Sequence, residues 1–144
     1  MATPAYKFLP HTTDAYIEAV GSTFEEAFEN AGLSLFDTMC DLKSISAKIT
    51  DSIQAQGADE VALLYDWLEA LLLKFELERK VYNRFDIPLV KKGSGGVGFK
   101  AKAYGESYSR EKHGSKVEVK AVTYHRMEVV RKDGVTTLRF ILDL

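Results

Sequence analysis

Residues 61–75 read VALLYDWLEALLLKF, and this stretch decides the fold class. Its apolar side chains recur every three or four residues, which is the spacing of one face of an α-helix. The stripe consists of Val61, Leu64, Tyr65, Leu68, Leu71, Leu72 and Phe75. Asp66, Glu69 and Glu76 mark the solvated side. The pattern predicts a long helix whose apolar face packs in a core rather than around a cofactor.

A second helix is predicted upstream, over residues 23–39. Its apolar stripe consists of Phe24, Ala27, Phe28, Ala31, Leu35 and Met39. Ser22 to Glu25 has the form of a capping box, in which a Ser hydroxyl accepts a free backbone N–H and a Glu three residues on reaches back. The helix is therefore expected to begin just after Ser22.

Alternating apolar and polar residues predict strands on both sides of these helices. The expected strands are 6–9, 14–20, 44–56, 81–91, 97–108, 116–132 and 135–144. Asp133-Gly134 is a hairpin turn sequence. Gly93 to Gly96 lacks the Lys-Ser/Thr of a phosphate-binding loop and no helix follows it, so a plain turn is expected there. We predict one α+β domain over residues 1–144, with two layers: two main helices packed on a mixed, largely antiparallel sheet.

Composition excludes several classes of protein. The chain has 144 residues, of which 46% are hydrophobic and 28% charged, as in a soluble globular domain. No apolar run approaches the roughly 18 residues of a membrane span, and Met1 to Lys7 lacks the apolar stretch of a secretory signal. A single cysteine, Cys40, excludes an internal disulfide and a cysteine-rich zinc site. We therefore expect a cytoplasmic protein with no membrane partner.

Charge is unevenly distributed along the chain. Residues 1–90 carry seven Lys or Arg and fifteen Asp or Glu, whereas residues 91–132 carry eleven and four. A basic segment on an acidic body could face RNA, a nucleotide or an acidic protein. The alternative is that these lysines form the solvated faces of strands.

The sequence contains no residue pattern that is typical of nucleophilic catalysis. His11, His113 and His125 are scattered without metalloprotease spacing, and no serine lies in a GxSxG elbow. Cys40 follows a predicted helix C-terminus, where the helix dipole raises the pKa of a thiol. We expect Cys40 to be inert packing.

Carboxylates concentrate at the end of the chain. In the last strand Asp143 leaves the apolar face of Leu138, Phe140 and Leu142, and it lies beside the α-carboxylate of Leu144. Two such groups are hard oxygen donors, suited to Ca²⁺, Mg²⁺ or Mn²⁺ rather than Zn²⁺. The alternative is a solvated chain end. Asp14 follows a Pro-His-Thr-Thr turn, where a carboxylate commonly accepts backbone N–H groups instead.

Several longer stretches occur in one order along the chain. They are PHTTD (10–14), YIEAVGSTFEEAFENA (16–31), DWLEALL (66–72), KAKAYGE (100–106), His113, VEVKAVTYH (117–125) and FILDL (140–144). Together they resemble the archease family over nearly the whole chain. That family usually reads His-Thr-Ala-Asp at the first stretch. Here Thr13 replaces the Ala, and Ala15-Tyr16 stand where an aliphatic residue and Gly are common, whereas His11 and Asp14 match.

The resemblance implies a non-enzymatic activator of the RtcB-type RNA ligase, which joins tRNA exon halves and repairs RNA breaks through a guanylylated histidine and metal ions. Such activators promote guanylylation and multiple turnover, and RNA contact is expected to be indirect, through the ligase. The resemblance also implies a divalent metal ion held by Asp14, Asp143 and Leu144. His11, Lys120 and His125 are candidate neighbours of that site or docking residues.

Two other functions remain open from the sequence. One is a metal-dependent enzyme that acts alone on RNA or nucleotides, which would need a general base such as His11 or His125 beside the carboxylates. The other is a chaperone-like module for RNA-modification enzymes.

Overall fold

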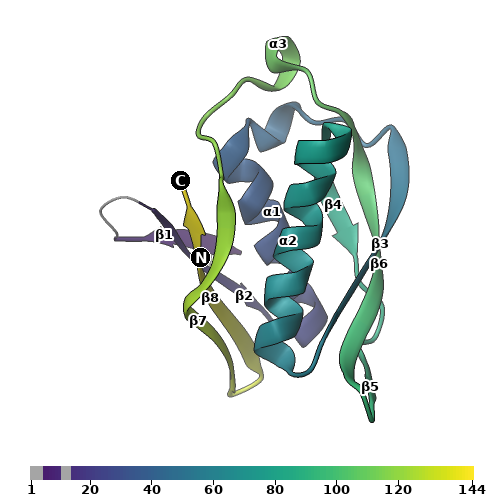
Figure 1. Cartoon of the computed structure of the whole chain (residues 1–144), viewed down its shortest axis with the longest axis vertical. Coiled ribbons are helices and arrows are strands. Elements are labelled where there is room, and N and C mark those ends of the chain that lie inside the picture. The colour runs from purple at the N-terminus through teal and green to yellow at the C-terminus, as the bar shows by residue number, and fades with distance from the viewer. Residues whose placement is uncertain (1–4, 11–13) are drawn as a thin grey trace.

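The two predicted helices lie side by side between two β-sheets, as Figure 1 shows. This computed structural model describes residues 5–10 and 14–144. The helical elements are α1 (Phe24–Met39), the 3-10 turn η1 (Leu42–Ser44), α2 (Glu60–Glu78) and the single turn α3 (Arg110–His113). The strands are β1 (Tyr6–Leu9), β2 (Ala15–Gly21), β3 (Ile49–Gly57), β4 (Lys80–Asp86), β5 (Lys91–Gly93), β6 (Gly96–Ser107), β7 (Ala121–Lys132) and β8 (Val135–Asp143).

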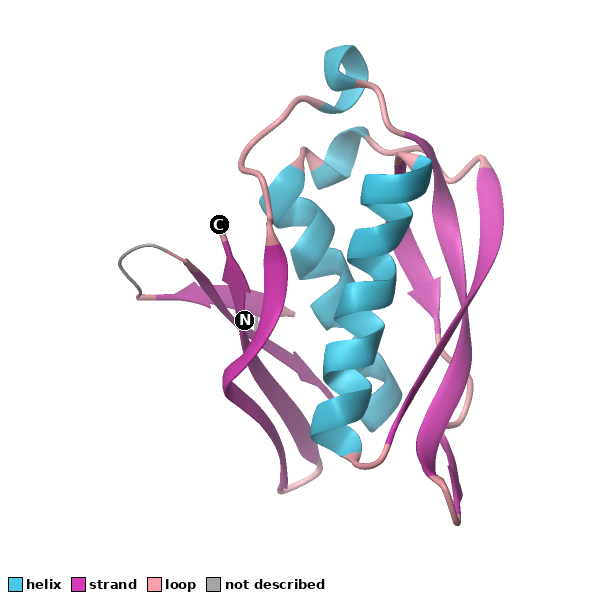
Figure 2. Ribbon diagram, viewed as in Figure 1, coloured by secondary structure: helices cyan, strands magenta, loops and turns pink. Residues whose placement is uncertain are grey.

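The strands are divided between two sheets, which Figure 2 shows on either side of the helices. The first has the order β1-β2-β8-β7, and the second has the order β3-β6-β4 with β5 paired to β6. Every strand pair in the described part of the chain is antiparallel. The predicted α+β class, with two main helices and a largely antiparallel arrangement, is confirmed. The helices are covered on both sides, so the single sheet that we expected is in fact two.

Trp67 of α2 lies at the centre of the core and is fully buried. Its indole N–H donates to the carbonyl oxygen of Phe28 on α1, at 2.8 Å, which joins the two helices. Its ring also meets Phe85 of β4 and Phe99 of β6 edge-on, at centroid distances of 5.3 and 5.1 Å. Such pairs favour a unique packing arrangement. The apolar stripe predicted from the sequence lies in the same core, as its fully buried Leu64, Leu68 and Leu71 confirm.

The first helix begins one residue later than its predicted cap. Thr23, rather than Ser22, is the N-cap, and its hydroxyl accepts from the backbone N–H of Glu26 at 3.0 Å. The Glu26 carboxylate in turn accepts from the backbone N–H of Ser22 at 3.0 Å. Glu25, which we expected to close the capping box, instead accepts from the backbone N–H of Val90. The box exists but is shifted by one residue.

The predicted strand 81–91 is interrupted after Asp86, at the end of β4. Pro88 has no N–H to donate to a ladder. The neighbouring donors are taken by the first helix: Ile87 donates to Glu29 and Val90 to Glu25, at 2.8 and 3.1 Å. Side chains of α1 therefore replace the strand partner, and pairing resumes only at β5.

The predicted strand 116–132 begins later, at Ala121, because the preceding residues form a loop around α3. Glu106, at the end of β6, holds this loop. Its carboxylate accepts from Lys112 Nζ at 2.7 Å and from the backbone N–H of Ser46 at 2.8 Å, and it lies 2.8 Å from His113 Nε2. His113 is buried, and its Nδ1 accepts from the backbone N–H of Ser109. His113 thus has a structural role.

Cys40 lies at the end of α1, within the core. Cys40 is fully buried, and burial raises the pKa of its thiol to about 11, so the thiol stays protonated, as predicted for inert packing. Within the described residues, no helix has both the length and the apolar character that crossing a membrane requires.

Candidate functional site

The pairing of β2 with β8 ends directly next to Asp14 and Asp143. Ala15 on β2 lies opposite Leu142 on β8, and Asp14 and Asp143 are the next residue on each chain. Facing residues of an antiparallel ladder have Cα atoms about 4.5–5.5 Å apart. Alternate residues point to opposite faces, and Ile17, Ala19, Phe140 and Leu142 point into the core. The two aspartates therefore belong to the outer face, at one end of the first sheet.

Lys120 is brought to the same place from the other side. Asp143 is paired with Ala121 of β7, and the backbone N–H of Lys120 donates to the carbonyl oxygen of Asp143 at 2.7 Å. Asp143 is thus held between two strands. The side chain of Leu144 is half-buried and packs against the core.

The donors gathered here are oxygens: two side-chain carboxylates and the α-carboxylate of Leu144. They are the ligand type that Ca²⁺, Mg²⁺ and Mn²⁺ prefer. In the described part of the chain, no three His, Cys, Asp or Glu side chains form a group that could hold a metal ion. A site at this place therefore needs the α-carboxylate as its third protein donor, and with it the donor set fits a hard divalent cation.

The structure does not bring His125 together with the aspartates. His11 lies outside the described residues. His125 is exposed, in a stretch of β7 that follows Thr123, which pairs with Ile141, and precedes Glu128, which pairs with Arg139. It is thus at least two positions of β8 away from Asp143.

That stretch of β7 is a large bulge, whereas the sequence predicted a continuous strand. Residues 124–127 stand opposite Phe140 alone, and Arg126 has a positive φ of 57°. Bulges redirect side chains and are common beside functional sites. A signal for it exists in the sequence: Val122 and Met127 are both buried but are five residues apart, which a regular strand would place on opposite faces.

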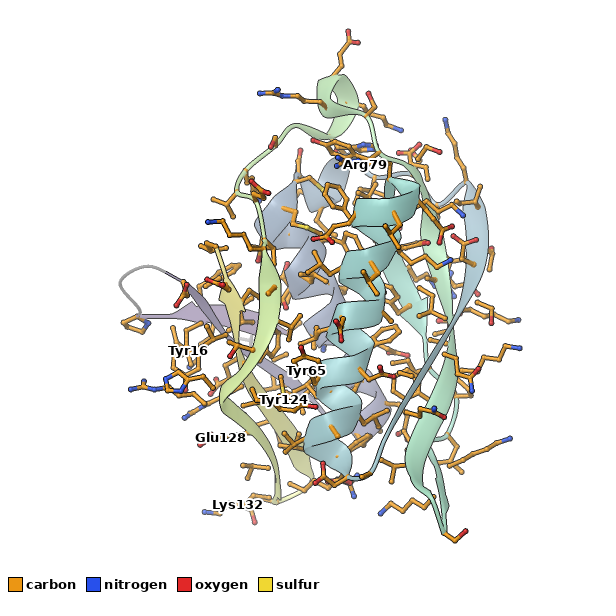
Figure 3. The ribbon with its side chains drawn as sticks, viewed as in Figure 1. Tyr16, Tyr65, Arg79, Tyr124, Glu128 and Lys132 are labelled. Atoms are coloured by element: carbon orange, nitrogen blue, oxygen red, sulfur yellow. The ribbon has the colours of Figure 1, made fainter. Side chains whose placement is uncertain are left out.

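The bulge links the first sheet to α2. Tyr124 stacks on Tyr65 of α2, with ring centroids 4.2 Å apart and an interplanar angle of 6°, and Figure 3 shows the two residues close together. The Arg126 guanidinium lies 6.0 Å from the ring of Tyr16, two residues after Asp14. The bulge therefore reaches both the second helix and the strand that begins at the aspartates.

Charged side chains cross the outer face next to the aspartates. Lys7, Glu18, Arg139 and Glu128 are successive cross-strand neighbours on β1, β2, β8 and β7. Lys7 and Arg139 pair with Glu18 at 3.2 and 2.9 Å. Partial burial works against ionisation, but the hydrogen bonds from Arg139 and Lys7 prevail and hold the pKa of Glu18 below its usual value. This row fixes the register of the strands that carry Asp14 and Asp143.

Comparison with known proteins identifies the family. The model of the Archease protein family matches residues 6–144. The chain belongs to the archease family. This archease is 37% identical to the protein archease of Sulfolobus acidocaldarius over 139 residues, covering 96% of this chain and 98% of the relative. It is 39% identical to that of Pyrococcus furiosus over 135 residues, covering 93% and 94%.

Two solved structures share the archease fold. The solution structure of a Methanobacterium thermoautotrophicum protein is 35% identical and has a TM-score of 0.84, covering 97% of this chain and 99% of that one. A crystal structure from Thermotoga maritima, described as an archease and possible chaperone, has a TM-score of 0.57 over 100% of this chain and 98% of that one. Its identity of 18% makes the likeness one of fold alone.

Proposed function

We propose that this archease is a non-enzymatic activator of an RtcB-type RNA ligase in tRNA splicing and RNA repair. In this proposal the protein acts in the cytoplasm, promotes guanylylation of the ligase and supports its turnover. A divalent metal ion bound by Asp14, Asp143 and the α-carboxylate of Leu144 takes part. The observation that supports the proposal is the β2–β8 register, whose last pair, Ala15 with Leu142, directly adjoins Asp14 and Asp143.

The role of the chain's own residues follows from this geometry. The aspartates lie at an exposed end of the first sheet rather than in a closed cavity, so a partner protein could approach them directly. When bound, the metal would supply positive charge for a nucleotide phosphate or for an acidic loop of the ligase. Lys120, adjacent to Asp143, would supply a further cation, and the ion-paired strands keep these groups in register.

The same geometry favours an activator over an enzyme that acts alone. Hydrolysis or transfer at a metal site needs a general base within reach of the reacting water or hydroxyl. His125 is displaced along β7 by the bulge. Both ring nitrogens of His113 are hydrogen-bonded in the loop around α3, one to the Glu106 carboxylate and one to the backbone N–H of Ser109. Neither of these two histidines lies beside Asp143, and His11, the other candidate base, is outside the described residues.

The test is a guanylylation assay with purified components. Ligase, GTP and metal are incubated with and without this protein, and covalent guanylate on the ligase is measured, followed by joining of RNA ends. We expect the protein to raise both rates at substoichiometric amounts and to do nothing to RNA or GTP by itself. Turnover of RNA or GTP without ligase would instead establish the enzyme, and an unchanged ligase would refute activation.

A further inference from the structure

The outer face of the second sheet is a basic surface that neither helix covers. On β6, Lys100 and Lys102 are exposed, whereas the alternate Ala101 and Ala103 are buried against the helices. The neighbouring strands complete this outer face with Thr50, Ser52 and Gln54 of β3, Tyr104 of β6, and Arg84 and Asp86 of β4. We call it the β6 face. Besides its cations it carries the carboxylate of Asp86 and, at its edge, that of Glu29.

The basic segment that we noted in the sequence is split by the fold. Lys116 pairs with Asp37 of α1 at 3.0 Å, and Lys120 lies at the first sheet. Lys100 and Lys102 lie on the β6 face, with Lys91 and Lys92 of β5 exposed at one end of it. Four of the eleven Lys and Arg residues of 91–132 therefore lie on or beside the β6 face, which is distinct from the aspartate site.

The lysines of the β6 face are not neutralised by other described residues. In the part of the chain that the structure describes, neither Lys100 nor Lys102 forms an ion pair. The carboxylate of Asp86 is already engaged: it accepts from the Tyr104 hydroxyl at 2.8 Å and pairs with Arg84 at 3.3 Å. A net positive face with unpaired lysines attracts a polyanion.

The surface is hollowed rather than flat. One hollow of about 440 Å³ lies among Gln54, Gln56, Leu89 and Lys100, and a second of about 380 Å³ lies among Asp86, Lys102 and Tyr104. Both are lined by Pro88 and Lys100, so they adjoin each other along β6. Together they form a trough that follows the row of lysines. An extended chain would lie in it.

A planar cation is exposed beside Tyr104, which lines the second hollow. The guanidinium of Arg84 lies over the ring of Tyr104, 4.7 Å from its centroid, and the Arg84 side chain is 64% exposed. Nucleobases that are not paired stack on arginine and tyrosine planes in this way. An acidic peptide has no comparable use for a stacking platform, and its carboxylates would be served by lysines alone.

We propose that the β6 face binds single-stranded RNA directly. The lysines contact phosphates, the Arg84–Tyr104 pair stacks a base, and the amide of Gln54 and the hydroxyls of Thr50 and Ser52 are within the same face for base edges or ribose. Lys100 and Lys102 are two residues apart, about 6.6 Å along the strand, which suits successive phosphates of an extended chain. This inference does not rest on ligase activation, because it uses none of the aspartate-site residues.

The direct test is binding of the purified full-length protein to a fluorescent uridine-rich 12-mer, measured by anisotropy at several salt concentrations and without ligase. Contacts of Lys91, Lys100 and Lys102 with phosphates predict a slope of log K against log salt of about −2.1 for a single strand. The double variant Lys100→Gln with Lys102→Gln should reduce that slope by about 1.4. The matched control is Lys43→Gln with Lys132→Gln, which removes the same charge from exposed positions outside the face.

Stacking is tested separately from charge. Arg84→Lys keeps the positive charge but removes the planar guanidinium group. We expect it to weaken RNA binding about fivefold at a fixed salt concentration, which is the size of effect expected for the loss of one stacked base. A poly-glutamate peptide of equal charge and a duplex of equal length are the competitors. Equal binding by the face and control variants, or competition by the peptide or duplex as strong as by the single strand, would overturn the proposal. A variant that abolishes RNA binding but leaves guanylylation intact would support it and leave the proposed function standing.

Discussion

The Cα of Gly105 on β6 lies so close to the carbonyl oxygen of Val81 on β4 that no side chain fits between them. Gly105 is paired with Tyr82 of β4 and with Ile49 of β3, so it stands in the middle of the second sheet. The register of β4 shifts directly after Tyr82. The close approach of the two backbones is what this bulge requires.

Gly105→Ala should therefore prevent normal folding. A Cβ would collide with backbone atoms, which cannot rotate away as a side chain can, so the central strands must separate. We expect a loss of at least about 3 kcal/mol in the free energy of unfolding, or an insoluble product. Urea unfolding would measure it. Gly95→Ala is the control, since a Cβ at Gly95 meets nothing within 4 Å. Equal stability of both variants would contradict this account of the bulge.

Asp143→Asn, and separately Asp14→Asn, should abolish metal binding and ligase activation without unfolding the protein. Each change removes one of few negative ligands, and hard cations depend on ligand charge for their affinity. Calorimetry with Ca²⁺ and Mn²⁺, melting curves and the guanylylation assay would be compared. Asp133→Asn is the control, because it removes the same charge at the β7–β8 hairpin, where Asn tolerates the positive φ of 54°. Normal metal affinity in either site variant would exclude that residue as a ligand.

Extending the chain beyond Leu144 by a few neutral residues should weaken metal binding about tenfold or more, ~1.4 kcal/mol upward. The extension turns the α-carboxylate into a peptide carbonyl and removes one negative charge from the donor set. The same residues added before Met1 should leave binding unchanged. Two versions of the protein with tags at opposite ends are compared by calorimetry. If they bind equally, the two aspartates hold the ion without Leu144.

Glu106 should make stability depend on pH in a defined window. Hydrogen bonds from Lys112, His113 and the backbone of Ser46 lower the pKa of Glu106 from 4.5 to about 2. Because the pKa is depressed in the folded state, the stabilisation is complete above about pH 4.5 and is lost as the pH falls toward 2.

The variant Glu106→Gln tests this dependence. At pH 7 we expect its melting temperature to be lower by about 5 °C, with a flatter decline between pH 4.5 and 2 than in the wild type. Glu76→Gln removes an exposed carboxylate and serves as the control. Parallel pH profiles for wild type and Glu106→Gln would show that the interaction of Glu106 with the α3 loop does not stabilise the fold.

The helices were predictable because their signal is local. The stripe from Val61 to Phe75 can be recognised from the helical period alone. In the structure its Leu64, Leu68 and Leu71 are completely buried. The division into two sheets was not predictable in this way. Alternation of apolar and polar residues indicates that a segment is a strand, but it does not indicate which strand it pairs with. The boundary errors have the same origin: side chains of α1, distant in sequence, take the donors of Ile87 and Val90.

The candidate site shows the same limit. The resemblance drew attention to Asp14 and Asp143, but their adjacency depends on the pairing of Ala15 with Leu142, near opposite ends of the sequence. The bulge that displaces His125 could have been inferred from the spacing of Val122 and Met127. The β6 face could have been inferred from Lys100 and Lys102, which alternate with alanines, although not the position of Arg84 over Tyr104.

The pairing of β2 with β8 also sets the order of events during translation. β2 ends at Gly21 and β8 begins at Val135, so at ~5–20 residues per second a ribosome needs roughly 6–23 s between them. During that interval one edge of β2 lacks its partner strand β8, and Asp143 has not yet been synthesised. A nascent chain that stalls before β8 exposes an unpaired strand edge, a template for aggregation. Joint capture of an ion by Asp14 and Asp143 would therefore report that synthesis has passed through β8.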